Sequence, residues 1–189
     1  MGMLEGIRVS ELGGGVSAPF CGKLLADYGA DVIKIETPLG GDPSRHAGPF
    51  VNNDPHPEKS IPFLYLNTNK RGITLDIFSS AGRAILDSLM STSDIVVQNM
   101  AVHEIEALSL TSRNLEAINP RLIITSITPF GLSGPYKNFE STDIVTYALS
   151  GLMYHSGDSD REPLRNVLNQ SFYVSGINAA VATTAALFQ

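Results

Sequence analysis

The sequence predicts an α/β fold: an open, doubly wound and mostly parallel sheet with helices on both faces. Short apolar, β-branched runs alternate with segments of helical periodicity along the 189 residues. The first run ends in three glycines and is followed by a helical segment and a second run, which is the order of a right-handed βαβ unit. Residues 94–97 have the composition of a buried parallel strand. Together these observations favour one α/β domain.

Local signals define the elements of the first half. Residues 7–12 are expected to form a strand, and Pro19 opens a segment in helical register that ends at Gly29. Residues 31–36 form the second expected strand. The interval 37–62 holds six prolines and three glycines. A connection so long and broken is typical of a functional or mobile loop.

The second half continues the alternation and brings the loops to one edge of the sheet. In parallel α/β sheets, ligands bind outside the carboxyl ends of the strands, near the point where strand order reverses. The loops 13–18, from 37, from 98 and from 128 fall on that edge, so we expect the chemistry there. The remaining expected elements are strands over 72–76, 94–97 and 122–127 and helices over about 80–90, 111–118, 143–152 and from Gly176 onward.

Composition limits the classes of function. A formal charge of −6 argues against nucleic-acid binding, because phosphate neutralisation needs clustered cations. Cys21 is the only cysteine, which excludes an internal disulfide framework and fits a reducing compartment. We interpret it as a small buried hydrophobe rather than a nucleophile. The four histidines lie far apart, so no metal site is expected. Without a long apolar run, the protein is expected to be cytoplasmic and to have no membrane contact.

Two short motifs leave alternatives open. Residues 13–18 have the spacing of a dinucleotide fingerprint, and Glu36 at the end of the second strand would accept the ribose hydroxyls. The same glycines also suit a close chain reversal alone. The segment 67–72 places Lys70 next to Arg71 beside two amides. A solvated turn and an anion site are equally consistent with that pattern.

Longer motifs carry a more specific message. They are LGGG and the following residues at 12–36, GGDPSR at 40–45, NKRGITLD at 69–76 and TPFGLSGPY at 128–136. In this order they resemble the family III CoA-transferases, the CaiB/BaiF group of formyl-CoA transferase-like and L-carnitine dehydratase-like proteins. The resemblance covers nearly the whole chain. Several motifs in order are more specific than one glycine spacing, so the resemblance displaces the dinucleotide interpretation.

The resemblance implies a fold and an activity. Residues 1–189 would be the N-terminal, Rossmann-like and CoA-binding part of the family's large domain, with the small domain and the returning C-terminal segment absent. Family members form interlocked homodimers and move CoA from an acyl-CoA to a carboxylic acid through an aspartate. That aspartate stands four residues before Gly176, where this sequence has Phe172. No catalytic residue is therefore carried over.

The resemblance also implies positions for CoA contacts. Thr37 and Ala107 stand where some members have phosphate-binding arginines, whereas Lys137 keeps a cation and Asn99 keeps the family's asparagine. We expect CoA or an acyl-CoA as substrate, a carboxylic acid as acceptor and no metal. The contact positions are Val16 and Ser17, chiefly through the backbone, Thr37, Leu75, Asp76, Ile77, Phe78, Asn99, Met100 and Lys137.

Three functions stay open at this point. The first is a CoA-transferase module whose nucleophile is absent from this chain. The second is a non-catalytic CaiB/BaiF-like domain or subunit that acts in dimer assembly. The third, a nucleotide-dependent oxidoreductase, rests on the short glycine motif alone. If CoA binds, its adenine-phosphate end is expected over the first loops and its thiol toward Phe172.

Overall fold

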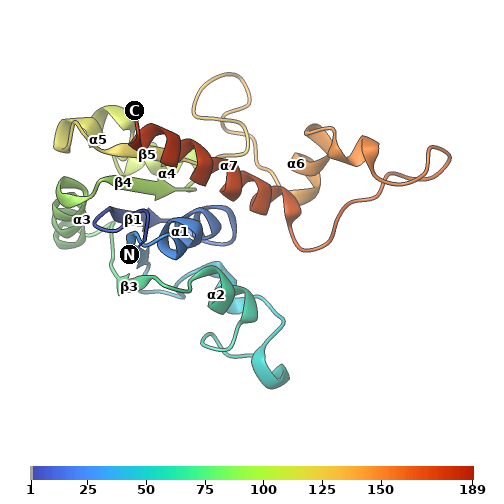
Figure 1. The fold of residues 1–189 in the computed structure, drawn as a ribbon, viewed down its shortest axis with the longest axis horizontal. Helices are drawn as coiled ribbons and strands as arrows, with labels where there is room; N and C mark the ends of the chain where they lie inside the picture. The colour runs from blue at the N-terminus through green and yellow to red at the C-terminus, as the bar shows by residue number, and fades with distance from the viewer. Residues whose placement is uncertain (1) are drawn as a thin grey trace.

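The computed structural model describes residues 2–189 and confirms the α/β fold, which is built on one five-stranded parallel sheet. The strand order is β3-β2-β1-β4-β5, so the order reverses between β1 and β4 (Figure 1). Doubly wound sheets bind their ligands at this reversal. The strands are β1 (Arg8–Leu12), β2 (Asp31–Glu36), β3 (Arg71–Thr74), β4 (Ile95–Gln98) and β5 (Ile123–Ser126).

Helices cover both faces of the sheet, as expected. One core lies under α1 and α7, and the other lies under α3, α4 and α5. Successive residues of β4 alternate between these cores, because side chains along a strand point to opposite faces: Ile95 joins the first and Val96 the second. The α-helices are α1 (Ser17–Asp27), α2 (Ile61–Leu66), α3 (Ser80–Thr92), α4 (Val102–Ala107), α5 (Ser112–Ile118), α6 (Asp143–Leu149) and α7 (Gln170–Leu187).

Several elements differ from the sequence prediction. The α2 helix lies inside the proline-rich interval, where the Ser60 hydroxyl accepts a hydrogen bond from the Phe63 N–H at 3.3 Å and caps its first turn. The α4 helix was not predicted either. The α7 helix begins at Gln170 rather than Gly176, so it includes position 172. Short 3-10 turns occupy Pro43–His46, Val51–Asn53 and Leu152–His155.

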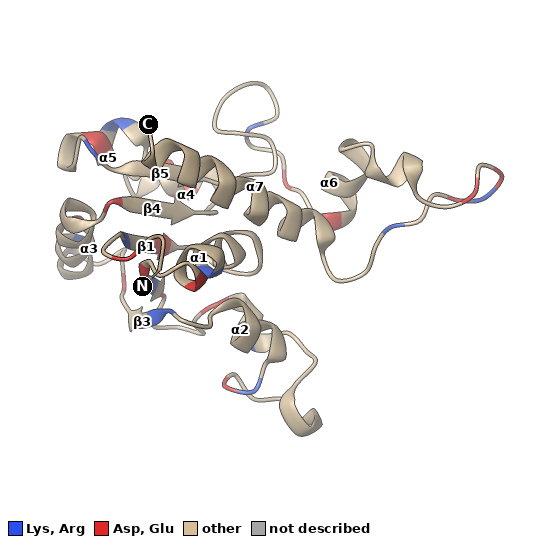
Figure 2. Cartoon of the chain, in the orientation of Figure 1, with Lys and Arg blue, Asp and Glu red and all other residues tan. Residues whose placement is uncertain are grey.

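The α7 helix has no charged residue and packs closely on α1 (Figures 1 and 2). A Cβ added at Gly176 would lie 2.7 Å from the Ser17 carbonyl oxygen, so only glycine permits this approach. The contact brings the first turn of α7 beside the loop that follows β1. The opposite side of α7 exposes Val174, Ile177 and Val181. Within residues 2–189, no helix is both long enough and apolar enough to cross a bilayer.

Candidate functional site

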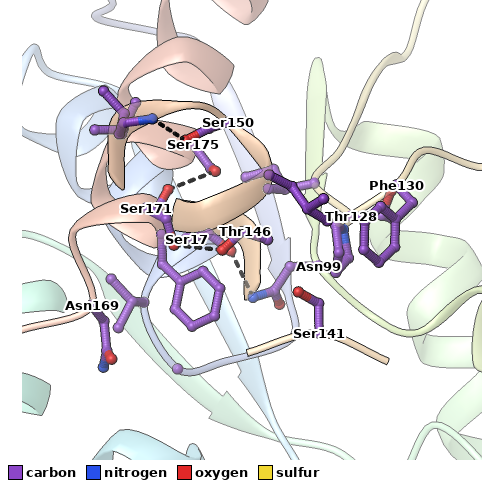
Figure 3. Close-up of a pocket in the computed structure, with 18 of the residues that line it drawn as sticks. Ser17, Asn99, Thr128, Phe130, Ser141, Thr146, Ser150, Asn169, Ser171 and Ser175 are labelled. Atoms are coloured by element: carbon purple, nitrogen blue, oxygen red, sulfur yellow. Dashed lines mark hydrogen bonds between the residues drawn. The ribbon is translucent and has the colours of Figure 1, made fainter. Parts of the chain in front are cut away.

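Two adjoining pockets open at the carboxyl edge of the sheet and share Gly14, Gly15 and Asn99. The larger has a volume of about 640 Å³. It lies between the loop of residues 13–18 after β1, which we call the glycine loop, the loop after β5 and the first turn of α7. We call it the α7 pocket, and Figure 3 shows its lining. The smaller, of about 420 Å³, lies over the ends of β2 and β4 and the segment after β3, and we call it the β2 pocket. All the loops that the sequence placed on this edge contribute to one pocket or the other.

Asn99, just after β4, fixes the glycine loop through its side-chain amide. Its Oδ1 accepts from the Gly14 N–H at 3.1 Å, and its Nδ2 donates to the Gly14 carbonyl at 2.7 Å. The Nδ2 also donates to the Ser17 hydroxyl at 3.1 Å (Figure 3). A Cβ added at Gly13 would overlap Asn99 Oδ1, and the φ of Gly13, +100°, also favours glycine. Asn99 therefore holds the loop in a conformation that only glycine can adopt at position 13.

Asp42 holds the same loop from the side of β2. Its Oδ1 accepts from the Gly15 N–H at 3.0 Å and from the Ser44 N–H and hydroxyl, each at 2.7 Å. The Gly14 and Gly15 N–H groups are thus both used within the protein. By contrast, the N–H groups of Val16 and Ser17 have no acceptor among residues 2–189. These two groups, at the start of α1, are free donors of the loop.

A buried ion network lies beneath the loop. Lys34 Nζ lies 2.9 Å from Glu11 Oε1 and 2.6 Å from Asp42 Oδ2, and Lys70 Nζ lies 2.7 Å from Glu11 Oε2. The contacts to Glu11 Oε2 and Asp42 Oδ2 are ion pairs without hydrogen-bond geometry. Glu11 and Lys34 face each other in the register of β1 and β2. All four side chains are at most 2% exposed, and their formal charges cancel.

Burial and the neighbouring charges act in opposite directions on the pKa values of this network. Burial lowers the pKa of Lys70 to about 8, against the attraction of Glu11. For Lys34 burial also opposes the charged form, but Glu11 and Asp42 together raise its pKa above the ordinary value. Both proposed interpretations of segment 67–72 are wrong for Lys70, because its Nζ points inward and donates to the Pro19 carbonyl at 2.8 Å. Arg71 instead pairs with Asp31 at the surface.

Glu36, the acidic residue of the dinucleotide interpretation, is fully engaged within the protein. Its two oxygens accept from Arg45 at 2.7 and 2.8 Å, and Oε2 also accepts from the Asp42 N–H at 2.8 Å. Burial would raise the pKa of Glu36, but the hydrogen bonds from Arg45 hold it below its ordinary value. Both Glu36 oxygens are thus already bound within the protein, and the structure gives no support to a dinucleotide site here.

The α7 pocket has a polar wall that anchors the first turn of α7. The Ser171 N–H and hydroxyl donate to Asp143 Oδ1 at 3.0 and 2.7 Å. The Thr146 hydroxyl lies 2.7 Å from that of Ser171 (Figure 3). Asp143 begins α6, so α6 fixes the start of α7. No local sequence pattern indicates this contact. The next residue, Phe172, lines the pocket.

The structure brings together most of the positions expected to contact CoA. Asp76 and Lys137 line neither pocket: the Asp76 carboxylate accepts from the Phe78 N–H, and Lys137 Nζ lies 3.2 Å from Glu106. Contact between these positions and CoA remains a prediction. Val16 and Ser17 line the α7 pocket, Thr37, Leu75, Ile77, Phe78 and Met100 line the β2 pocket, and Asn99 lines both.

Other chemistry finds little support in the described chain. Cys21 is fully buried, and burial followed by the charge of Glu11 raises its pKa to about 12, so it carries no thiolate at neutral pH. Its interpretation as a small buried hydrophobe is confirmed. Between residues 2 and 189, no three His, Cys, Asp or Glu side chains are grouped so as to hold a metal ion.

Comparisons with known proteins agree with the motif order. The profile of CoA-transferase family III matches residues 4–189. The chain is 37% identical to the succinyl-CoA:(R)-benzylsuccinate CoA-transferase subunit BbsE of Thauera aromatica, over 92% of this chain and 42% of that protein. It is 37% identical to a succinate–glutarate CoA-transferase of Agrobacterium fabrum, over 97% of this chain and 46% of that protein.

A solved structure is also similar. The crystal structure of a CaiB/BaiF family protein from Brucella suis superposes with a TM-score of 0.90 at 35% identity, over 99% of this chain and 49% of that one. The chain therefore spans about half the length of the solved structure and less than half the length of these curated relatives.

Proposed function

This chain belongs to CoA-transferase family III, and from that premise we propose that it binds an acyl-CoA thioester for the transfer of CoA between an acyl-CoA and a carboxylic acid. One observation carries the proposal. Two pockets adjoin at the glycine loop, and the larger one ends at position 172, where the family resemblance puts the reacting group. Together they offer an extended site for an elongated ligand.

The chemistry along the two pockets favours one orientation of CoA. The β2 pocket has apolar walls that suit the adenine ring. The free N–H groups of Val16 and Ser17 start an 11-residue helix, and such a helix end attracts the pyrophosphate. The thioester then lies in the α7 pocket beside Phe172. Asn99 and Asp42 contribute by fixing the loop between the two ends of the ligand.

Phe172 favours a specific role for this chain within a transferase. Transfer requires a carboxylate that attacks the thioester carbon and expels the CoA thiolate. Among the described residues, no Asp or Glu lines the α7 pocket, and Phe172 presents a phenyl ring there. We therefore assign to this chain the binding of the thioester and not the attack on it. The carboxylate would come from another subunit.

Two further observations support a role in an assembly. The relative from Thauera aromatica is named as a subunit of its transferase. The uncharged α7 helix exposes Val174, Ile177 and Val181, an apolar face suited to a second chain. The proposed assembly is a dimer in which this chain completes an acyl-CoA site, and its proposed location is the cytoplasm.

Calorimetric titration of the full-length protein with acetyl-CoA tests binding. The expected result is saturable binding at one site per chain. The Asn99→Ala variant loses the bonds that fix Gly14, each worth about 1 kcal/mol, so its affinity should fall about tenfold or more. Asn114→Ala, which removes an exposed amide on α5 outside both pockets, is the matched control and should bind as the parent does. Folded protein that gives no binding heat would contradict the proposal.

Substitution of Phe172 tests the division of roles. Phe172→Asp installs a carboxylate in the α7 pocket, whereas Phe172→Asn installs a side chain of the same size without charge. With acetyl-CoA and a carboxylic acid, the aspartate variant is expected to exchange CoA, while the parent and the asparagine variant are inert. Transfer by the parent protein alone would show that its nucleophile lies elsewhere in its own chain and would overturn the passive role.

A further inference from the structure

We propose that the β2 pocket accepts the adenosine end of CoA without recognising its 3′-phosphate, so that thioesters of CoA and of 3′-dephospho-CoA bind almost equally well. The inference rests on the proposed function, because it takes acyl-CoA as the ligand. It concerns a different property, namely which part of the nucleotide contributes to affinity.

The charges that line the β2 pocket disfavour a phosphate. Three carboxylates belong to its lining, those of Glu36, Asp42 and Glu104. Among the described residues that line it there is no Lys, Arg or His. Glu36 and Asp42 are already paired with Arg45 and Lys34, so a phosphate dianion in this pocket would find no free cation to give it a charge-assisted hydrogen bond.

Two cations that contact carboxylates of the lining are held in ion pairs. Lys34 is buried between Glu11 and Asp42. Arg45 donates to both oxygens of Glu36 and pairs with Glu58 at 2.7 Å. Its guanidinium carbon also lies 3.7 Å from the centre of the Phe63 ring. Turning either cation toward a phosphate would leave a buried or half-buried carboxylate unpaired, which is strongly unfavourable. The ion pairs beside the glycine loop thus leave neither Lys34 nor Arg45 free for the ligand.

The pocket does offer a surface for a flat, uncharged ring. Leu75 and Ile77 are buried in its wall, and Met100 is half-buried. Phe78 is 66% exposed at the pocket, although a large aromatic side chain is usually covered. Stacking on an aromatic face accepts any base and makes no use of phosphate charge. We infer that Phe78 and Met100 bind the adenine, while the 3′-phosphate points to solvent.

A substitution at Thr37 can introduce a cation that binds the 3′-phosphate. Its side chain is exposed and lines the β2 pocket. The variant Thr37→Arg would place a free guanidinium where the pocket has none. Leu39→Arg is a matched control, because Leu39 is 92% exposed and is absent from the lining, so it adds the same charge nearby but outside the pocket.

The test compares the dissociation constants of acetyl-CoA and acetyl-3′-dephospho-CoA by calorimetry on the full-length protein. For the parent we expect the two constants to agree within about threefold. In Thr37→Arg, acetyl-CoA should gain about tenfold or more over the dephospho form, the effect of one charge-assisted contact, whereas Leu39→Arg should behave as the parent does.

The outcomes separate the two proposals. A parent protein that prefers acetyl-CoA by more than about tenfold would overturn the inference and leave the proposed function standing. An unchanged ratio in Thr37→Arg would also overturn it, since the adenosine would then lie outside the β2 pocket. If neither thioester binds to the folded parent protein, the proposed function itself fails, and the inference fails with it.

Discussion

Replacing Lys34 with methionine tests whether the buried ion network stabilises the site. Methionine has a similar length and no charge, so the substitution removes the Nζ contacts to Glu11 and Asp42 without opening a large cavity. The network changes from formally neutral to a net charge of −1 in a region that is at most 2% exposed. Removing one partner of a buried pair costs about 3–5 kcal/mol. Domains are commonly stable by only about 5–15 kcal/mol, so the loss should be large.

Urea unfolding of the full-length protein, followed by circular dichroism, measures this loss. The exposed pair of Lys59 and Asp54 gives the control, and Lys59→Met should leave the unfolding midpoint nearly unchanged. The double variant Lys34→Met with Asp42→Asn removes one carboxylate along with the lysine and should be more stable than Lys34→Met alone. If Lys34→Met unfolds at the midpoint of the parent, the account of the network is wrong.

Three further predictions address neighbouring groups. Gly22→Ala should destabilise the protein strongly in thermal unfolding, because the added Cβ overlaps Glu11 Oε2, whereas Gly72→Ala meets nothing within 4 Å and should be tolerated. Cys21 should resist iodoacetamide at pH 8 in the native protein and react fully in urea, because its thiol is buried and has a pKa of about 12. Rapid labelling of the native protein would contradict the burial and the raised pKa of this thiol. The pKa of Lys70 is about 8 in the folded state and 10.5 ordinarily, so between these values the unfolded chain holds a proton that the folded one has released. The unfolding free energy of the parent relative to Lys70→Met should therefore rise from pH 8 to pH 10.5, and a fall over that range would refute the assignment.

The sequence was sufficient for the sheet because its strands are short apolar runs between clear turn signals. All five strands lie where periodicity and composition predicted them, to within two residues at either end. The helices α2 and α4 were missed because each has only six residues, too few to show a period of 3.6. The early start of α7 was missed because Asn169 is left-handed and no side chain caps the helix, so the usual start signals are absent.

The site was less accessible from sequence, because its supports are long-range contacts between polar residues. Glu11 and Lys34 sit in strands where charged side chains would ordinarily face water, and their burial is explained only by their mutual register. Asp42 carried a local signal, since an aspartate directly before proline is a common helix cap. The contact of Asp143 with Ser171 has no such signal, as it joins residues far apart in sequence.

A crystal structure of the full-length protein with acetyl-CoA would show whether the α7 and β2 pockets form one binding site across the glycine loop. We predict density for the adenosine against Phe78, for the pyrophosphate at the N–H groups of Val16 and Ser17, and for the acetyl thioester beside Phe172. Acetyl-CoA bound elsewhere, with both pockets empty at saturating ligand, would contradict the account.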